Sequence, residues 1–164
     1  MEIRKVVQTD DFDAIGEIYA KSWKTAYKGI VSQSYLDKLQ GSRWSSVLAE
    51  SQNDAFIIVD SGKYIGTSSI CAARDFEMTG WGEIISIYLL PEYFAKGYAE
   101  PLFNCAVNNL LEKGYKNIYL WVLEGNIRAQ RFYEKQGFNK NGDKLPIEIA
   151  GEYLIELRYV RSFE

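Results

Sequence analysis

The chain of 164 residues contains no histidine. That absence excludes a serine–histidine–aspartate triad, a histidine-ligated zinc and the commonest general base of enzymes. Any acid–base chemistry must therefore use Glu, Asp, Tyr, Lys, Cys or water, and we expect no metal site. Only two cysteines are present, Cys71 and Cys105, each within an apolar stretch. We interpret them as small buried side chains, with a disulfide or a nucleophile as the alternatives.

Long apolar runs and linker-like segments are also missing. The first residues, Met1 to Lys5, are not followed by an apolar run of the kind that a secretory signal contains. No stretch reaches the ~20 apolar residues of a membrane-crossing helix. We therefore expect a cytoplasmic protein without a membrane partner. With three prolines and no Ser/Gly-rich segment, residues 1–164 are predicted to form one domain.

The charge is small and evenly spread. There are 19 Lys and Arg residues against 22 Asp and Glu residues, a net charge of −3. A nucleic-acid-binding surface needs basic residues in a cluster, so we expect no nucleic acid partner. Because 47% of the residues are hydrophobic, the chain has the material for a folded core.

The hydrophobic periodicity changes along the chain. The N-terminal part predicts one short strand and three helices, the first of which can be capped by Asp10 and Asp11. An antiparallel strand run follows, and then strands and helices alternate. This order predicts an α/β protein with a mixed sheet and helices on both faces. The expected strands are 3–7, 55–59, 64–72, 83–90, 118–123, 139–144 and 151–160, and the later helices are 32–39, 42–50, 97–113 and 127–136.

Two local patterns carry information on function. In the first, a strand over 83–90 leads through a turn into a helix. A helix N-terminus offers unpaired N–H groups and a partial positive charge, which suit a pyrophosphate. Gly97 and Ala99 would leave the backbone open to such a ligand, although Gly97 alone is equally explained as a hinge before the helix.

The second pattern covers residues 126–138. Asn126 is a good N-cap, and Ala129 and Phe132 share one helix face, so an amphipathic helix explains the segment locally. That explanation does not account for the occurrence of both patterns in one chain and in this order.

Together the two segments resemble the GNAT superfamily of N-acetyltransferases, and the likeness covers about residues 55–161. The superfamily pattern Gln/Arg-x-x-Gly-x-Gly/Ala falls on residues 94–99. An early Trp-x-x-x-Tyr-x-Gly segment, beginning at Trp23, is similar to one bacterial branch. The pattern Asn-x-x-Ala-x-x-Phe-Tyr-x-x-x-Gly-Phe is matched at every named position, by Asn126, Ala129, Phe132, Tyr133, Gly137 and Phe138.

The resemblance implies the GNAT acyltransferase fold, a mostly antiparallel sheet in which two parallel strands splay apart. Acetyl-CoA would bind between the strands 83–90 and 118–123 as a co-substrate. Its pantetheine arm would contact the end of the strand in the first motif, and its pyrophosphate would contact the turn before the helix. The implied contacts are Tyr88, Leu89 and Leu90 for pantetheine, and Ala95, Lys96, Gly97, Tyr98 and Ala99 for the pyrophosphate.

The same resemblance implies catalytic residues. Glu83 lies eleven residues before Phe94, the spacing of a strand glutamate that takes the proton of the amine. The alternative for Glu83 is a solvated carboxylate at a strand edge. Tyr133 matches a tyrosine that protonates the departing sulfur, and the alternative is a packed aromatic ring. Asn126 would bind the pantetheine arm, cap its helix, or do both.

The acceptor is expected to be a primary amine of a small molecule or peptide. In relatives, the region 23–35 and a loop over 141–151 flank the opening, which makes Trp23, Tyr27, Tyr35 and Glu148 the candidate acceptor contacts. Each of them is also explained as packing or solvated surface. The resemblance is compatible with a homodimer formed through the last strands.

Three residues depart from the superfamily pattern. Phe94 replaces the usual Gln or Arg, Glu100 adds a negative charge in the first helical turn, and Pro101 removes one N–H donor. These residues favour an alternative hypothesis, a GNAT-shaped module that binds acyl-CoA or a protein partner without turnover. Glu83 and Tyr133 favour the enzyme.

Overall fold

The computed structural model describes residues 1–164, which form one seven-stranded sheet in the order β1-β2-β3-β4-β5-β7-β6. Only the pair β4 and β5 is parallel, and every other pair of neighbours is antiparallel. The predicted mixed sheet is thus confirmed. The strands are β1 Glu2–Lys5, β2 Asp54–Asp60, β3 Lys63–Ala72, β4 Gly82–Leu89, β5 Asn117–Leu123, β6 Asn139–Ile149 and β7 Glu152–Ser162.

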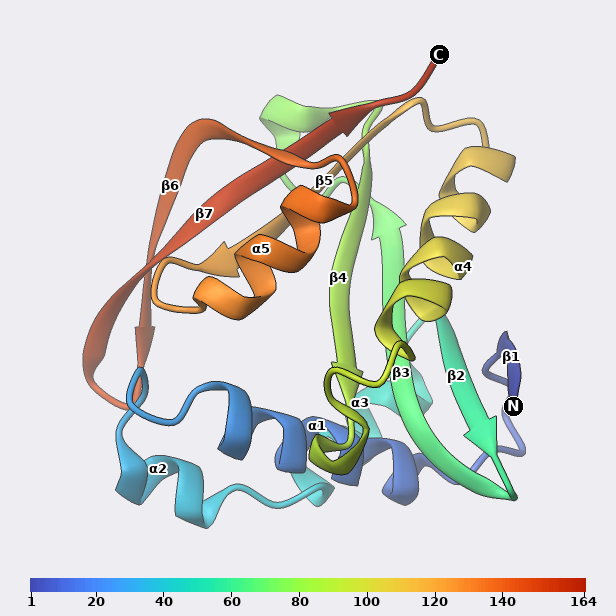
Figure 1. The fold of residues 1–164 in the computed structure, drawn as a ribbon, viewed down its shortest axis with the longest axis vertical. Helices are drawn as coiled ribbons and strands as arrows, with labels where there is room; N and C mark the ends of the chain where they lie inside the picture. Colours follow the sequence, from blue (N-terminus) through green and yellow to red (C-terminus); the bar gives the residue numbers. More distant parts are fainter.

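Helices cover both faces of this sheet (Figure 1). Two of the helices begin at the predicted caps: the Asp11 side chain accepts a hydrogen bond from the Ala14 N–H, and Asn126 accepts one from the Ala129 N–H. None of the helices combines the length with the apolar character that crossing a membrane requires. The helices are α1 Phe12–Ala26, α2 Gln33–Lys38, α3 Ser42–Glu50, α4 Ala99–Glu112 and α5 Ile127–Lys135.

An extra residue in β4 decides which side chains face which helix. In the pairing with β3, Ser69 opposes Ser86 but Ile70 opposes Ile84, so β4 carries one unpaired residue between them. Before this bulge, Gly82 faces α4, where an added Cβ would lie 2.9 Å from Leu110. After the bulge, the even-numbered residues face α1 instead. The hydrogen bond between the Ser86 and Tyr19 hydroxyls, 3.0 Å long, shows this.

The core around α4 and α5 is aromatic. Phe103 of α4 is 1% exposed, and its ring centroid lies 5.4 to 5.7 Å from the rings of Phe132, Tyr133 and Phe138. This contact joins α4 to α5 in front of the sheet (Figure 1). Both cysteines are free and partly buried, and burial raises the pKa of Cys71 to about 11, so its thiol stays protonated.

The C-terminal hairpin differs from expectation. The segment 141–151, expected as a loop, is mostly strand, since β6 continues to Ile149 and the turn contains only Ala150 and Gly151. Gly142, Asp143 and Pro146 suggest a loop in the sequence, but β6 is the edge strand of the sheet, where a bulge and a proline are tolerated. The register shift between Lys140 and Lys144 accommodates Gly142 and Asp143, and Pro146 pairs with Ile155 of β7.

The aromatic core gives a stability prediction. Phe103→Ala removes a fully buried ring and should lower the free energy of unfolding by about 3–5 kcal/mol. The same change at Phe76, which is 86% exposed, should stay within about 0.5 kcal/mol of wild type. Urea denaturation followed by fluorescence measures both, and equal losses in the two variants would contradict the assignment of the core.

Candidate active site

A cavity of about 1040 Å³ opens where β4 and β5 separate. The two strands are paired only at Gly82–Ile118 and Glu83–Tyr119, and beyond these pairs the β5-facing edge of β4 has no strand beside it. Residues 84–89 of β4 form one wall of the cavity, and α5 and the β6–β7 hairpin contribute others. The splayed parallel strands implied by the family resemblance are therefore present.

One end of the cavity is suited to an anion. Ala95 and Gly97, both with positive φ angles of 57° and 86°, line it directly before α4. The backbone N–H groups from Ala95 to Tyr98 donate no hydrogen bond within the chain. Unpaired N–H groups ahead of a helix N-terminus form an anion-binding concavity.

Arg128 of α5 supplies a cation at the same end. Its guanidinium carbon lies 3.9 Å from the centroid of the Phe94 ring, and it makes no ion pair or hydrogen bond with the protein. Partial burial lowers the pKa of this guanidinium below its ordinary value, but the group remains charged. The sequence did not point to Arg128, because it falls at a variable position of the family pattern that covers α5.

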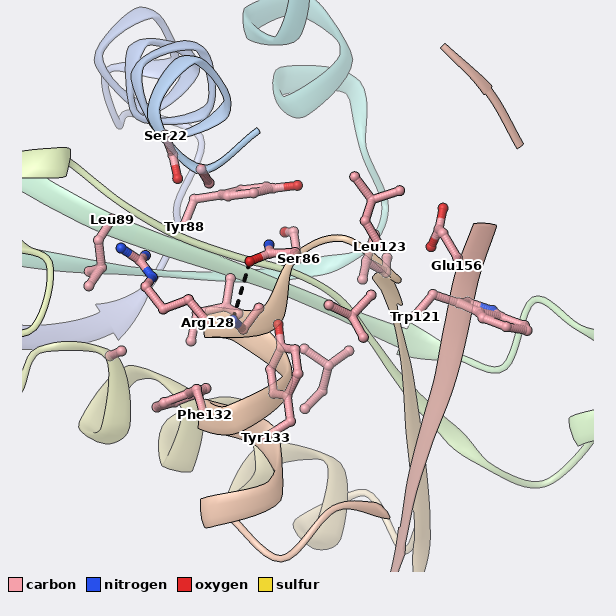
Figure 2. A pocket seen from close by; sticks show the side chains of 18 of the residues that line it. Ser22, Ser86, Tyr88, Leu89, Trp121, Leu123, Arg128, Phe132, Tyr133 and Glu156 are labelled. Atoms are coloured by element: carbon pink, nitrogen blue, oxygen red, sulfur yellow. Dashed lines mark hydrogen bonds between the residues drawn. The ribbon is translucent and has the colours of Figure 1, made fainter. Parts of the chain in front are cut away.

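Tyrosine hydroxyls gather in the middle of the cavity. Tyr133 is 8% exposed, its hydroxyl has no hydrogen-bond partner, and Figure 2 shows this hydroxyl pointing into the open space. Burial raises the pKa of Tyr133, and the neighbouring Tyr88 raises it further, so the phenol is protonated at neutral pH. On the opposite wall the indole Nε1 of Trp23 donates to the Tyr88 hydroxyl at 3.1 Å.

Glu83 is engaged in a buried network. Its carboxylate, 2% exposed, accepts from the Arg74 Nη2 at 2.6 Å, the Arg74 backbone N–H at 3.1 Å and the Tyr119 hydroxyl at 2.8 Å. Burial alone would raise the pKa of Glu83, but the hydrogen bonds from Arg74 and Tyr119 outweigh it and hold the pKa below its usual value. A carboxylate with these partners is a weak proton acceptor.

Glu156 of β7 is a second cavity carboxylate, and sequence analysis did not single it out. It is half-buried, and its side chain has no hydrogen-bond or ion-pair partner. Burial raises the pKa of Glu156, while Arg74 lowers it and Glu83 raises it. Burial raises the pKa of Tyr27 to about 12, with smaller contributions from Tyr133 and Glu156, so Tyr27 lies near both of these groups.

The other predicted site residues divide into two groups. The cavity is lined by the predicted contacts Trp23, Tyr27, Tyr88, Leu89, Ala95, Gly97, Ala99, Asn126 and Tyr133. Leu90 is buried in the core, while Lys96 and Tyr98 lie outside the cavity wall, beside the Tyr93 ring.

Two predicted acceptor contacts are corrected, because neither lines the cavity. Tyr35 packs in a separate cluster under α2, with the Arg43 guanidinium over its ring at 5.6 Å. Glu148 is exposed because β6 alternates: Ile147 and Ile149 face the cavity, and Glu148 between them faces the other side.

The model of the acetyltransferase (GNAT) family matches residues 12–138. The chain belongs to the GNAT family. An uncharacterized N-acetyltransferase of Bacillus subtilis is 30% identical over 154 residues, 90% of this chain and 86% of that protein. A spermidine N(1)-acetyltransferase of Thermoplasma acidophilum is 26% identical, over 97% of this chain and 98% of that protein.

A solved structure has the same fold. The PaiA N-acetyltransferase of Thermoplasma acidophilum, in complex with coenzyme A, superposes with a TM-score of 0.74 at 21% identity, covering 99% of this GNAT chain and 100% of that one. The resemblance stated from the two sequence motifs is thereby confirmed, and the GNAT chain described here is an acetyltransferase by family.

The Glu83–Arg74 pair gives a pH-dependent stability prediction. Because the folded-state pKa of Glu83 is depressed, the pair contributes stability above the unfolded pKa, and the contribution is lost as pH falls through the folded value. Arg74→Ala leaves a buried carboxylate without its cation and should cost about 1–3 kcal/mol at neutral pH. The cost should shrink at about pH 4, where Glu83 becomes protonated in the variant.

Urea denaturation at both pH values measures this effect. The double variant Arg74→Ala/Glu83→Gln removes the charge and should recover part of the loss at neutral pH. A pH-independent cost of Arg74→Ala would show that packing, and not the ion pair, is responsible.

Proposed function

We propose that this GNAT enzyme transfers the acetyl group of acetyl-CoA to a primary amine by direct attack in a ternary complex. The observation that carries the proposal is one continuous cavity with unpaired N–H groups and a cation at one end, a free carboxylate at the other, and the Tyr133 hydroxyl between them. An anionic nucleotide carrier and a cationic acceptor fit opposite ends of such a cavity.

The anion-binding end fits the diphosphate of CoA. The N–H groups from Ala95 to Ala99 would bind its oxygens, and Arg128 would supply the positive charge that Phe94 does not. The unpaired edge of β4 near Tyr88 and Leu89 offers backbone groups to the amide groups of pantetheine, as an additional strand would. Asn126 already caps α5 and lines the cavity beside it.

The proposed chemistry forms one bond and breaks one. The neutral amine nitrogen attacks the thioester carbonyl carbon, the C–N bond forms, and the C–S bond breaks. The Tyr133 hydroxyl gives its proton to the leaving sulfur and regains one from the acylated nitrogen, which balances the transfer. A backbone N–H of β4 near residues 87–89 would stabilise the negative charge that develops on the carbonyl oxygen.

A binding module without turnover is the second candidate. Glu100, which lines the anion-binding end, and Pro101 favour it. Arg128 adds a positive charge to the same cavity, and the unpartnered Tyr133 hydroxyl has a place in catalysis that a module would not need. Release of free thiol from acetyl-CoA, measured with a panel of amines, separates the two candidates.

The role of Arg128 is tested by binding. Arg128→Ala should weaken CoA binding about tenfold in calorimetry, a change of about 1.4 kcal/mol, because a partly desolvated charge-assisted contact is lost. The effect should diminish at high salt. Arg131→Ala, on the same helix but away from the cavity, is the matched control and should leave the affinity unchanged. Equal affinities in all three proteins would remove Arg128 from the site.

The role of Tyr133 is tested by kinetics. Tyr133→Phe should lower kcat by roughly 10²–10⁴-fold and leave the affinity for CoA nearly intact, because only the transition state uses the hydroxyl proton. Tyr153→Phe, at a position that is 80% exposed, is the control. A Tyr133→Phe enzyme with the kcat of wild type would reduce Tyr133 to a packing residue.

A further inference from the structure

The Glu156 carboxylate is the free negative charge at the acceptor end of the cavity. It lies on β7, opposite Leu123 of β5 and Leu145 of β6 in the sheet register. Figure 2 shows it across the cavity from Arg128, with the Tyr133 hydroxyl between them and the Trp121 ring beside it. A half-buried carboxylate without a partner is costly to keep in a folded protein unless a ligand uses it.

The other carboxylates that line the cavity are already neutralised or lie elsewhere. Glu83 is bound by Arg74 and by the Tyr119 hydroxyl. Asp75 forms an ion pair with Arg158. Glu100 belongs to α4, at the anion-binding end. A cationic acceptor therefore finds one uncompensated counter-charge at its end of the cavity.

The walls around Glu156 are largely apolar. Leu145, Ile147 and Ile149 project into the cavity from β6, and the Trp23 and Trp121 rings contribute further apolar surface. Such walls favour an apolar body over a charged one. A second ammonium group, like those of a polyamine, would meet aliphatic side chains here, or the Arg74 cation.

We propose, on the basis of the function proposed above, that Glu156 binds the acceptor's ammonium group and takes its proton, and that the acceptor is a primary amine with an apolar body and no second charge. Glu156 accepts one proton from the ammonium directly or through a water, which frees the nitrogen lone pair for attack on the thioester carbonyl. That proton passes to solvent after each turnover. The second proton of the nitrogen leaves through Tyr133 as the C–S bond breaks, so the products are the amide, the free thiol and one released proton.

The experiment compares two amines on the full chain with saturating acetyl-CoA. With 2-phenylethylamine, Glu156→Gln should lower kcat/KM on the order of 10²-fold at neutral pH. The deficit should shrink as pH approaches the amine's own pKa, where no base is needed; for a simple alkyl ammonium such as that of lysine this value is ~10.4. Wild type should prefer 2-phenylethylamine to spermidine by roughly tenfold or more in kcat/KM, since a buried second cation is costly.

A pH profile distinguishes a base from a structural residue. The groups facing Glu156 are Arg74 after β3, Glu83 on β4 and Tyr27 at the end of α1. Because the pKa of Glu156 is raised, wild-type kcat/KM should fall as pH drops through that raised value. Glu156→Gln should show no inflection there, and its kcat/KM should instead follow the fraction of neutral amine across the whole pH range. Glu156→Asp should retain an inflection from its carboxyl group, with reduced activity.

Two controls exclude trivial explanations. Glu112→Gln makes the same charge change at an exposed position on α4 and should behave as wild type. Glu156→Gln should melt no lower than wild type, because a carboxyl with a raised pKa destabilises the folded state at neutral pH. If Glu156→Gln unfolds, Glu156→Asp carries the test.

The outcomes separate the two proposals. If Glu156→Gln keeps wild-type kcat/KM at neutral pH, the role of Glu156 is overturned while the transferase function stands. If spermidine is preferred by wild type, the acceptor class is overturned. If wild type acetylates no amine, calorimetry of 2-phenylethylamine with the CoA complex decides. Binding that Glu156→Gln abolishes supports the ammonium contact and overturns only the transfer reaction. Absence of binding overturns both the ammonium contact and the transfer reaction.

Discussion

The shape of the candidate active site depends on one irregularity in the sheet, the extra residue of β4 between Ile84 and Ser86. A regular β4 would keep alternate residues on one face, whereas Gly82 faces α4 and Ser86 faces α1. The same distortion coincides with the point at which β4 parts from β5 after two residue pairs. The unpaired backbone edge, the open volume and the orientation of the tyrosine cluster all follow from this separation.

The two ends of the cavity differ in charge because different elements build them. The turn before α4 and Arg128 of α5 provide N–H groups and a cation, and the β6–β7 hairpin provides Glu156 among aliphatic side chains. The packing of α5 on Phe103 holds the Tyr133 hydroxyl between these ends. The electrostatic polarity of the site therefore follows from the topology, since no single motif contains both ends.

Local patterns predicted the parts of the fold that local chemistry determines. The caps at Asp11 and Asn126, and the turn at Gly97, each depend on residues that are neighbours in the chain. The side on which a residue of β6 lies is different, because a shift of one residue in the hairpin register reverses it. Glu148 was expected at the cavity because residues 141–151 were expected as a loop, whereas in the strand β6 the alternation of side chains places it on the other side. The Arg74–Glu83 ion pair likewise depends on the path of the β3–β4 connection, which no periodicity reports.

Phe94 illustrates how a motif departure is to be weighed. When the motif is compared one position at a time, an aromatic ring in place of Gln or Arg means that one polar contact is lost. In the structure the ring supports the guanidinium of Arg128, and a cation over an aromatic face keeps its donors in the plane free for an anion. The charge reaches the same end of the cavity from α5 instead of from the turn. The proposed diphosphate site needs a cation near unpaired N–H groups, and contacts between elements that a linear pattern does not record bring the two together.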